Sequence, residues 1–296
     1  MKKIDSIICD VSGTHTRVAY VDNKEIFSIR DYDTKDIKST KDLISMYMYL
    51  EKIETKKIVC SAAGRVNDTK SSIQLQNSTL LINEYEFKEI GFENITLLND
   101  FEAIANGVKD VSKVQVFGNF QNENNYLVIG AGTGLGVCEY KENITLNKEE
   151  GHISINEIQA QLTPREFDCM VKIQENLGKE SLEFEEILSG RGLERIYHYV
   201  AGSKLTAQEI SLFDTVSSQE TFNLFYSFYL KSILYFLEKH EQNQVVIAGG
   251  IIMKNMHKFS KEIKQQWIQK LQENNSCAKI ILDYDVSLYG LRNLSL

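Results

Sequence analysis

Residues 126–136 read YLVIGAGTGLG, and no other stretch says more about how this chain folds. The apolar run at 126–129 predicts a β-strand, and the β-prone residues at 137–140 predict a second one. Glycine occupies every second position from 130 to 136, where its lack of a side chain would let backbone N–H groups converge on an anion. The pattern predicts strand, glycine turn and strand, which either cradle a phosphate or form a β-hairpin without a ligand.

The spacing of these glycines excludes two common nucleotide-binding loops. A dinucleotide fingerprint reads G-x-G-x-x-G and opens a helix, whereas the repeat here leads into β-prone residues. A P-loop needs Gly-Lys followed by Ser or Thr, and no such sequence follows these glycines. A phosphate bound at this turn would therefore be bound in a third way.

The first thirty residues have a similar organisation. An apolar run ends at Asp10, residues 11–15 are turn-like, and the extended patterns that follow predict a β-meander. Asp10 could hold Mg²⁺ through water while Ser12, Gly13 and Thr14 face a phosphate, and the alternative is an ordinary Asp-initiated turn. Because strand, turn and strand occur twice, with helices after each, we expect two related α/β domains with a boundary just after Asp100.

A third glycine pair, Gly249 and Gly250, ends the apolar run at 245–247. Such a pair is weak as an isolated signal, since many strand-to-helix turns use glycine. Three loops of this kind in one chain, none of them with a lysine, favour nucleotide binding of the actin-like type.

Successive helices are predicted between residues 163 and 240. Thr163 and Glu166 have the spacing of a capping box, with a proline at the first helical position between them. The same spacing recurs from Thr206 and from Ser217. Residues 222–240 are aromatic and apolar nearly all round, which is typical of a buried helix.

Composition narrows the classes of partner. The chain has 296 residues, with 41 acidic and 33 basic side chains and a formal charge of −8. Net acidity without a basic cluster argues against nucleic acid or an anionic membrane as the main partner. The five cysteines include no C-x-x-C pair, so neither a zinc site nor a disulfide framework is predicted, and a cytoplasmic setting is expected.

These stretches, together with three further segments, resemble the bacterial glucokinase family within the hexokinase, Hsp70 and actin superfamily. Six motifs follow the family's order: DVSGTHTR at 10–17, LNDFEA at 98–103, the glycines at 130–136, EEGH at 149–152, EEILSGRGL at 185–193 and VIAGGI at 246–251. Each motif alone has a high false-positive rate. Six of them in order over most of the chain make coincidence implausible.

The resemblance implies ATP- and Mg²⁺-dependent phosphorylation of glucose at its 6-hydroxyl, with Asp100 as the general base. It implies contacts to the other sugar hydroxyls from Asn77, Asn99, Glu149, His152 and Glu185. It implies phosphate contacts from Thr14, Gly132, Thr133 and Gly134, with adenosine lying against Gly249 and Gly250. The implied partner is a small-molecule sugar, and a homodimer is expected by resemblance alone.

The resemblance also implies a two-domain, actin-like ATPase (ribonuclease H-like) α/β fold with a cleft between the domains. The smaller domain is expected at residues 1–100 plus about 283–296, because SLYG at 287–290 resembles the family's closing helix. The larger domain is expected at residues 101–282.

Structural interpretations stand beside the functional ones. Asn99 or Asp100 could cap a helix that ends near residue 107, and Glu149 and Glu150 could form a solvated acidic turn. His152 could be a core histidine, and Glu185 could lie on an exposed helix face. Ser12 stands where the family prefers glycine, and a positive φ there would cost on the order of 1 kcal/mol.

Two rival functions remain open beside phosphorylation of glucose. They are a kinase for another hexose or an N-acetylhexosamine, and a sugar-binding sensor with weak catalysis. The ROK relatives usually carry a cysteine cluster after the sugar-binding histidine, and none follows His152. A chaperone or filament-forming ATPase of the superfamily would have no use for the sugar motif.

Overall fold

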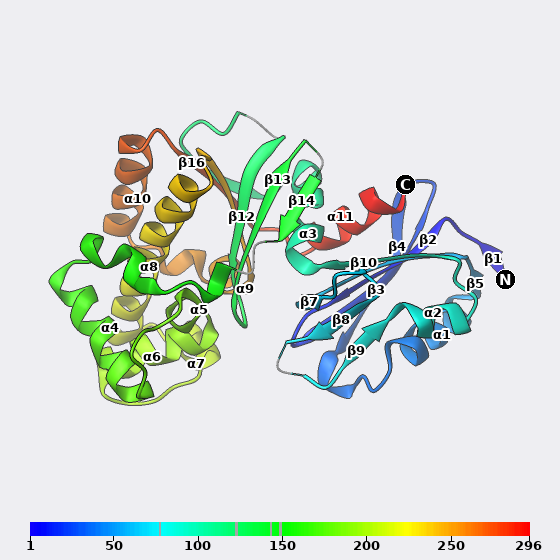
Figure 1. Ribbon diagram of the computed structural model, residues 1–296, viewed down its shortest axis with the longest axis horizontal. Coiled ribbons are helices and arrows are strands. Elements are labelled where there is room, and N and C mark those ends of the chain that lie inside the picture. The colour runs from blue at the N-terminus through cyan, green and yellow to red at the C-terminus, as the bar shows by residue number, and fades with distance from the viewer. Residues whose placement is uncertain (77, 122–123, 143, 148–149) are drawn as a thin grey trace. The chain divides into compact units, whose positions relative to one another are not determined.

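A computed structural model describes residues 1–76, 78–121, 124–142, 144–147 and 150–296 (Figure 1). Two candidate residues, Asn77 and Glu149, therefore lie outside the described residues. The chain divides into two compact units: unit 1 is Met1–Val111 with Tyr284–Leu296, and unit 2 is Ser112–Asp283. Each unit contains a mixed sheet with helices, which confirms the predicted α/β class.

Unit 1 is built on a five-stranded sheet in the order β10-β6-β2-β3-β4. Its strands are β2 (Ser6–Val11), β3 (His15–Asp22), β4 (Glu25–Asp33), β6 (Lys57–Ala62) and β10 (Asn94–Asn99). Strands β2, β6 and β10 are parallel, whereas β3 and β4 add to β2 as antiparallel neighbours. The β-meander predicted for the first thirty residues is confirmed.

Smaller elements complete unit 1. The remaining strands are β1 (Lys2–Lys3), β5 (Ile53–Glu54), β7 (Gly64–Val66), β8 (Ser72–Leu75) and β9 (Leu81–Asn83). The α-helices are α1 (Thr40–Glu51), α2 (Glu84–Glu89), α3 (Asp100–Gly107) and α11 (Val286–Ser295). Two glycines let α3 and α11 cross with their backbones in contact, because a Cβ on Gly107 or Gly290 would lie 1.9 or 1.8 Å from a carbonyl oxygen of the other helix.

Unit 2 is built on a six-stranded sheet in the order β11-β16-β15-β12-β13-β14. Its strands are β11 (Val114–Phe117), β12 (Asn125–Ala131), β13 (Leu135–Lys141), β14 (Ile144–Asn147), β15 (Gln244–Ala248) and β16 (Cys277–Ile281). Strands β12, β15 and β16 are parallel, and the other three pair antiparallel with their neighbours. Apart from β11, this order and these directions repeat those of unit 1, so the predicted relationship between two halves extends to their sheet topology.

The helices of unit 2 are α4 (Pro164–Leu177), α5 (Phe184–Ile187), α6 (Gly190–Ala201), α7 (Ala207–Leu212), α8 (Val216–Lys239), α9 (Gly250–Asn255) and α10 (Lys261–Glu273). The capping boxes predicted at Thr163 and Thr206 are confirmed. The one predicted at Ser217 is wrong. Thr215 caps α8 instead, because its side chain accepts a hydrogen bond from the Ser218 N–H at 3.1 Å and starts the helix at Val216.

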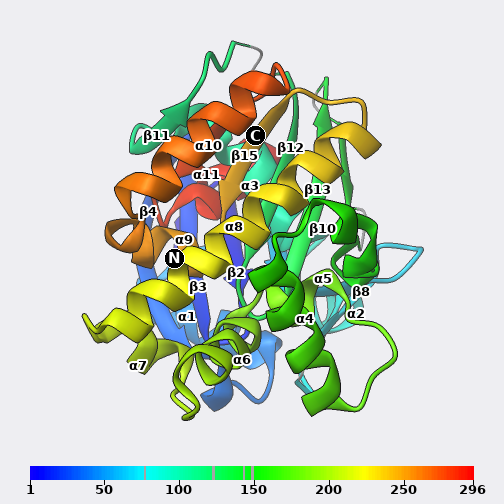
Figure 2. The same ribbon diagram turned by 90° about the vertical axis from the view of Figure 1, so that its left-hand side faces the viewer.

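Helix α8 is the buried helix predicted from its composition. Together with α10 it covers one face of the unit 2 sheet (Figure 2). The Tyr229 hydroxyl donates to the Ile129 carbonyl at 3.1 Å, and the Trp267 indole donates to the Tyr226 carbonyl at 3.1 Å, so α8 is bonded both to strand β12 and to α10. Among the described residues, no helix is both long and apolar enough to cross a membrane.

Candidate active site

The carboxylate of Asp10 is held by three side chains of unit 1. Its Oδ1 accepts from the Ser61 hydroxyl at 2.7 Å, and its Oδ2 accepts from Arg17 at 2.7 Å and from the Ser287 hydroxyl at 2.6 Å. Asp10 is only 7% exposed. With both acceptor positions of Oδ2 occupied, Oδ1 retains room for one further donor. That remaining lone pair could accept from a water or coordinate a cation, so Asp10 can serve a Mg²⁺ ion with the side chains around it as they stand.

The turn after Asp10 is closed by the side chain of Ser12. Its Oγ accepts from the His15 N–H at 3.0 Å and donates to the His15 carbonyl at 2.9 Å. Ser12 has no positive φ, so the strain cost considered for a serine in place of glycine does not arise. Gly13 and Thr14 are exposed at the tip of this turn.

Asn99 and Asp100 lie where strand β10 passes into helix α3. Asn99 is 6% exposed, its Oδ1 accepts from the Phe101 N–H at 2.9 Å, and its N–H donates to Glu102 at 3.1 Å, which forms a capping box. Its Nδ2 also donates to the Gly64 carbonyl at 3.1 Å. The capping interpretation of Asn99 is therefore confirmed. Asp100, partly exposed, is the first residue of α3, where the helix dipole favours a negative charge.

The glycine repeat of unit 2 is a β-hairpin with a short turn. Gly130 and Gly136 are paired across β12 and β13, so the turn proper is confined to residues 132–134. The Gly132 N–H donates to the Gly134 carbonyl at 2.9 Å, and the Gly132 carbonyl accepts from the Gly190 N–H at 2.9 Å. A Cβ on Gly132 would meet no atom within 4 Å. The turn thus presents open space on this side while its carbonyl fixes it to the start of α6.

The glycine pair after β15 lies next to the end of β12. Gly249 has a φ of +98°, and a Cβ there would lie 2.5 Å from the Ala131 carbonyl oxygen, so both backbone conformation and space require glycine. Gly250 begins α9, and a Cβ on it would meet nothing within 4 Å. Because β12 and β15 are parallel, this pair and the 132–134 turn share the carboxyl edge of the sheet.

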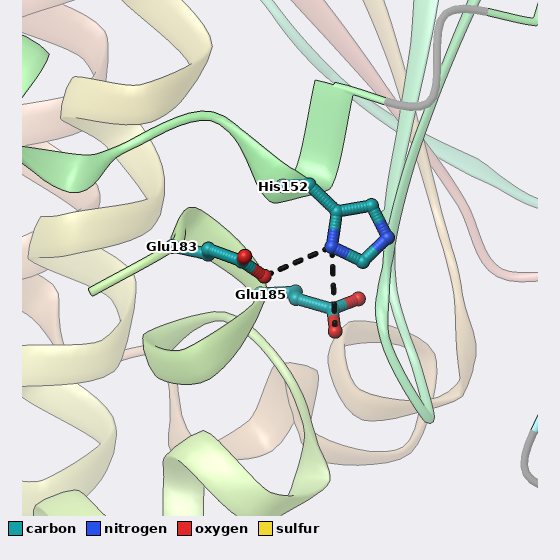
Figure 3. A group of neighbouring side chains, drawn as sticks. All are labelled: His152, Glu183 and Glu185. Atoms are coloured by element: carbon teal, nitrogen blue, oxygen red, sulfur yellow. Dashed lines mark hydrogen bonds and ion pairs between the residues drawn. The ribbon is translucent and has the colours of Figure 1, made fainter. Parts of the chain in front are cut away.

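Three ionisable side chains meet in unit 2: His152, Glu183 and Glu185 (Figure 3). The His152 Nδ1 lies 2.9 Å from Glu183 Oε2 and 3.9 Å from Glu185 Oε1. Their side chains are 51%, 39% and 11% exposed in the order His152, Glu183, Glu185. The interpretation of His152 as a core histidine is therefore wrong, and so is that of Glu185 as an exposed helix face.

Close backbone contacts place this cluster beside the glycine turn. A Cβ on Gly151 would lie 2.2 Å from the Leu135 carbonyl oxygen, so glycine lets the segment before His152 approach the start of β13. On the other side, Ser189 caps α6 and the next residue, Gly190, bonds to Gly132. The segment 183–190 therefore supplies both carboxylates of the cluster and the bond to the turn.

The chain matches the protein-family model described as Glucokinase over residues 7–290. It belongs to the glucokinase family. The glucokinase of Colwellia psychrerythraea is 30% identical over 234 residues, which cover 71% of this chain and 68% of that protein. The glucokinase of Escherichia coli O139:H28 is 28% identical over 206 residues. These residues cover 66% of this chain and 62% of that protein, which is under two thirds of its length.

A solved structure shares the fold of this chain. The glucokinase of an Antarctic psychrotroph superposes with a TM-score of 0.80 at 19% identity, over 98% of both chains. This likeness confirms the two-domain, actin-like ATPase fold implied by the sequence motifs. Family membership makes the chain a sugar-phosphorylating enzyme by class.

Sequence reasoning missed two residues of this glucokinase-family chain. Glu183 was not singled out, although it lies closest to His152 in the cluster. Arg17 was quoted within a motif but given no role, although it bonds Asp10. A third, Glu150, was considered as part of a solvated turn, yet it pairs with His240 at 2.5 Å and Lys239 at 3.1 Å, so that interpretation is wrong.

Proposed function

We propose that this chain is an ATP-dependent glucokinase that phosphorylates the 6-hydroxyl of glucose, with Asp100 as the general base. The observation that carries the proposal is the position of Asp100, held in the first turn of α3 by the Asn99 capping box at the carboxyl end of β10. A sugar hydroxyl is a poor nucleophile, and a carboxylate that takes its proton accelerates the transfer by about 10²- to 10⁴-fold.

The remaining sugar hydroxyls would be bound by hydrogen-bond acceptors and donors. We assign His152, Glu185 and Asn99 to this role, together with Asn77 and Glu149. The carboxylate of Glu185 and the ring of His152 already lie together, and Glu185 is largely buried. Loss of a substrate hydroxyl would leave such a group unpaired, which is how a site of this kind discriminates between sugars.

We assign the phosphates of ATP to the two turns. Thr14, with Gly13 and Ser12, is assigned to phosphate contact in the first turn, and Gly132, Thr133 and Gly134 in the second. Adenosine would lie against Gly249 and Gly250. The open side of Gly132 and of Gly250 supports close approach of a ligand. Mg²⁺ would arrive with the nucleotide as part of the substrate, neutralising phosphate charge. Asp10, whose carboxylate already accepts from three side chains, would contact it through water.

A sugar-binding sensor with weak catalysis is the second candidate. The observation that favours it is that polar groups of the first phosphate turn already have partners within the protein. Arg17 neutralises Asp10, and the Ser12 hydroxyl bonds within its own turn. A sensor would bind sugar through unit 2 without releasing ADP.

A coupled ADP-release assay with Mg-ATP tests the proposal across glucose, mannose, fructose, galactose and N-acetylglucosamine. Glucose-dependent release supports the proposed reaction. Release with another sugar alone would change the assigned substrate but not the assigned reaction. Sugar binding by calorimetry without any ADP release would favour the sensor. Light scattering of the same preparation would test the homodimer expected by resemblance.

A further inference from the structure

Glu183 contacts the ring of His152 at Nδ1. The Nδ1 of His152 lies 2.9 Å from Glu183 Oε2, whereas Nε2 points away from both carboxylates of the cluster (Figure 3). We propose that Glu183 is a positioning residue, which fixes the tautomer and orientation of His152 so that Nε2 accepts a hydrogen bond from a sugar hydroxyl. This inference rests on the proposed function for the identity of the ligand, but its structural part can be tested without any sugar.

The backbone of Glu183 is fixed directly beside the segment that carries His152. Ser154 and Glu183 form an antiparallel β-bridge, in which the Phe184 N–H donates to the Ile153 carbonyl at 2.9 Å and the Ile155 N–H donates to the Leu182 carbonyl at 2.9 Å. These two bonds set the distance between the two side chains before any ligand binds.

The start of α5 holds Glu183 from the other side. The Glu186 carboxylate accepts from the Glu183 N–H at 3.0 Å, and Lys179 pairs with Glu186 at 2.7 Å. Phe184, the next residue, is fully buried and packs against Tyr235 and Phe236. The Glu183 side chain is thus anchored at its base while its carboxylate reaches His152.

The chemistry of the pair decides which nitrogen carries the proton. An ionised carboxylate only accepts hydrogen bonds, so Nδ1 of His152 must be the donor. In the neutral imidazole the other nitrogen, Nε2, then has the lone pair. Glu185 adds a second acceptor within the same cluster, 3.9 Å from Nδ1. The cluster therefore selects ligands that present hydroxyl donors.

Nitrogen-15 NMR of histidine-labelled, sugar-free protein tests the tautomer. Spectra are recorded about two units above the ordinary histidine pKa of about 6.5, and the His152 signal is assigned with His152→Gln. We expect the Nδ1–H tautomer in the wild type and in Glu183→Gln, whose amide oxygen can still accept from Nδ1. Glu183→Ala should give a mixture or the Nε2–H form. An Nε2–H tautomer in the wild type would overturn the proposal without reference to any variant.

Steady-state kinetics with glucose test the consequence for binding. Glu183→Ala should raise KM roughly three- to tenfold, the size of one lost hydrogen bond, with kcat nearly unchanged. Glu183→Gln should restore most of the lost affinity. The control is Glu180→Ala, which removes an exposed carboxylate. The backbone carbonyl of Glu180, which accepts a hydrogen bond from Gln174, is kept in this variant, and KM should be unchanged.

The two proposals fail in different ways. A wild type without glucose turnover contradicts the proposed function, whereas the tautomer result stands by itself. An active wild type whose KM is the same in Glu183→Ala contradicts the positioning role. A Zn²⁺ titration that removes the Nδ1–H signal at one equivalent would also contradict it, since the three side chains would then be metal ligands.

Discussion

The guanidinium of Arg17 lies 2.7 Å from the carboxylate of Asp10 and at the same time bonds the segment that leads into the last helix. Its Nη1 donates to the Tyr284 carbonyl at 2.6 Å and to Asp285 at 3.0 Å. Burial alone lowers the pKa of Arg17, but Asp10 and Asp285 outweigh it and raise the pKa overall. One charged side chain thus links strands β2 and β3 to the chain's C-terminal segment.

Arg17→Met should therefore destabilise the protein strongly. The substitution leaves Asp10 buried without its counter-charge, which costs about 3 kcal/mol in the free energy of unfolding. Adding Asp10→Asn should recover about 1–3 kcal/mol of that loss, since it removes the buried negative charge that Arg17 no longer neutralises. Urea unfolding measures both.

The control for this pair is Lys35→Met, which breaks a surface ion pair of 3.3 Å with Asp33. Both side chains are more than half exposed, so the change should stay below about 1 kcal/mol. A loss for Arg17→Met no larger than that of the control would contradict the structural role of Arg17.

Glu166 should make the stability of the protein fall in acid. Burial by itself raises the pKa of Glu166, but hydrogen bonds from Lys231, Ser227 and Thr163 outweigh it, so the pKa in the folded state lies below the ordinary 4.5. A lowered pKa stabilises the fold above the unfolded-state value, and this contribution is lost as the pH falls through the folded-state value.

Glu166→Gln removes this contribution, so the free energy of unfolding should decline less steeply below about pH 4.5 in this variant than in the wild type. Urea unfolding at a series of acidic pH values measures the slope. Glu180→Gln, at an exposed position, serves as the matched control. Equal slopes in the wild type and Glu166→Gln would show that another carboxyl group causes the acid sensitivity.

Alanine should affect stability differently at two glycines of unit 2. A Cβ at Gly132 meets no atom within 4 Å, so Gly132→Ala should leave unfolding within about 0.5 kcal/mol of the wild type. If the turn binds phosphate, the added methyl group should still raise KM for ATP, by roughly fivefold or more.

Gly151→Ala places a Cβ 2.2 Å from the Leu135 carbonyl oxygen, so the backbone must shift at a cost of about 1–3 kcal/mol. Because His152 follows directly, KM for glucose should rise with it. Thermal unfolding and kinetics of both variants separate these effects. An unchanged KM for ATP in Gly132→Ala would argue against the phosphate role of the turn.

Patterns confined to a few neighbouring residues were predicted well from the sequence. The capping boxes at Thr163 and Thr206, the first β-meander and the strand–turn–strand at 126–140 all depend on contacts within a short stretch. The extent of the glycine turn was not fixed by its composition, because Gly130 and Gly136 continue the strand pairing. Thr215 and Ser217 both offer a hydroxyl at this end of α8, so local sequence did not decide between them. In the structure Thr215 is the cap.

Contacts between distant segments could not be predicted in this way. Glu183 and His152 are 31 residues apart and meet only because a β-bridge joins their segments. Arg17 and Asp285 are 268 residues apart and meet through the return of the chain to unit 1. Neither pairing leaves a local pattern, since a hydrogen bond or ion pair requires only a donor and an acceptor that the fold brings together. The six motifs predict which segments form the site, and the fold decides which other side chains lie against those segments.

The central claim is that Asp100 takes the proton of the sugar hydroxyl, and Asp100→Asn tests it most directly. Asparagine has nearly the same shape and can remain in the first turn of α3, so glucose binding by calorimetry should persist. Glucose-dependent ADP release should fall by about 10²- to 10⁴-fold, because the amide cannot accept the proton. Turnover within about threefold of the wild type would contradict the account.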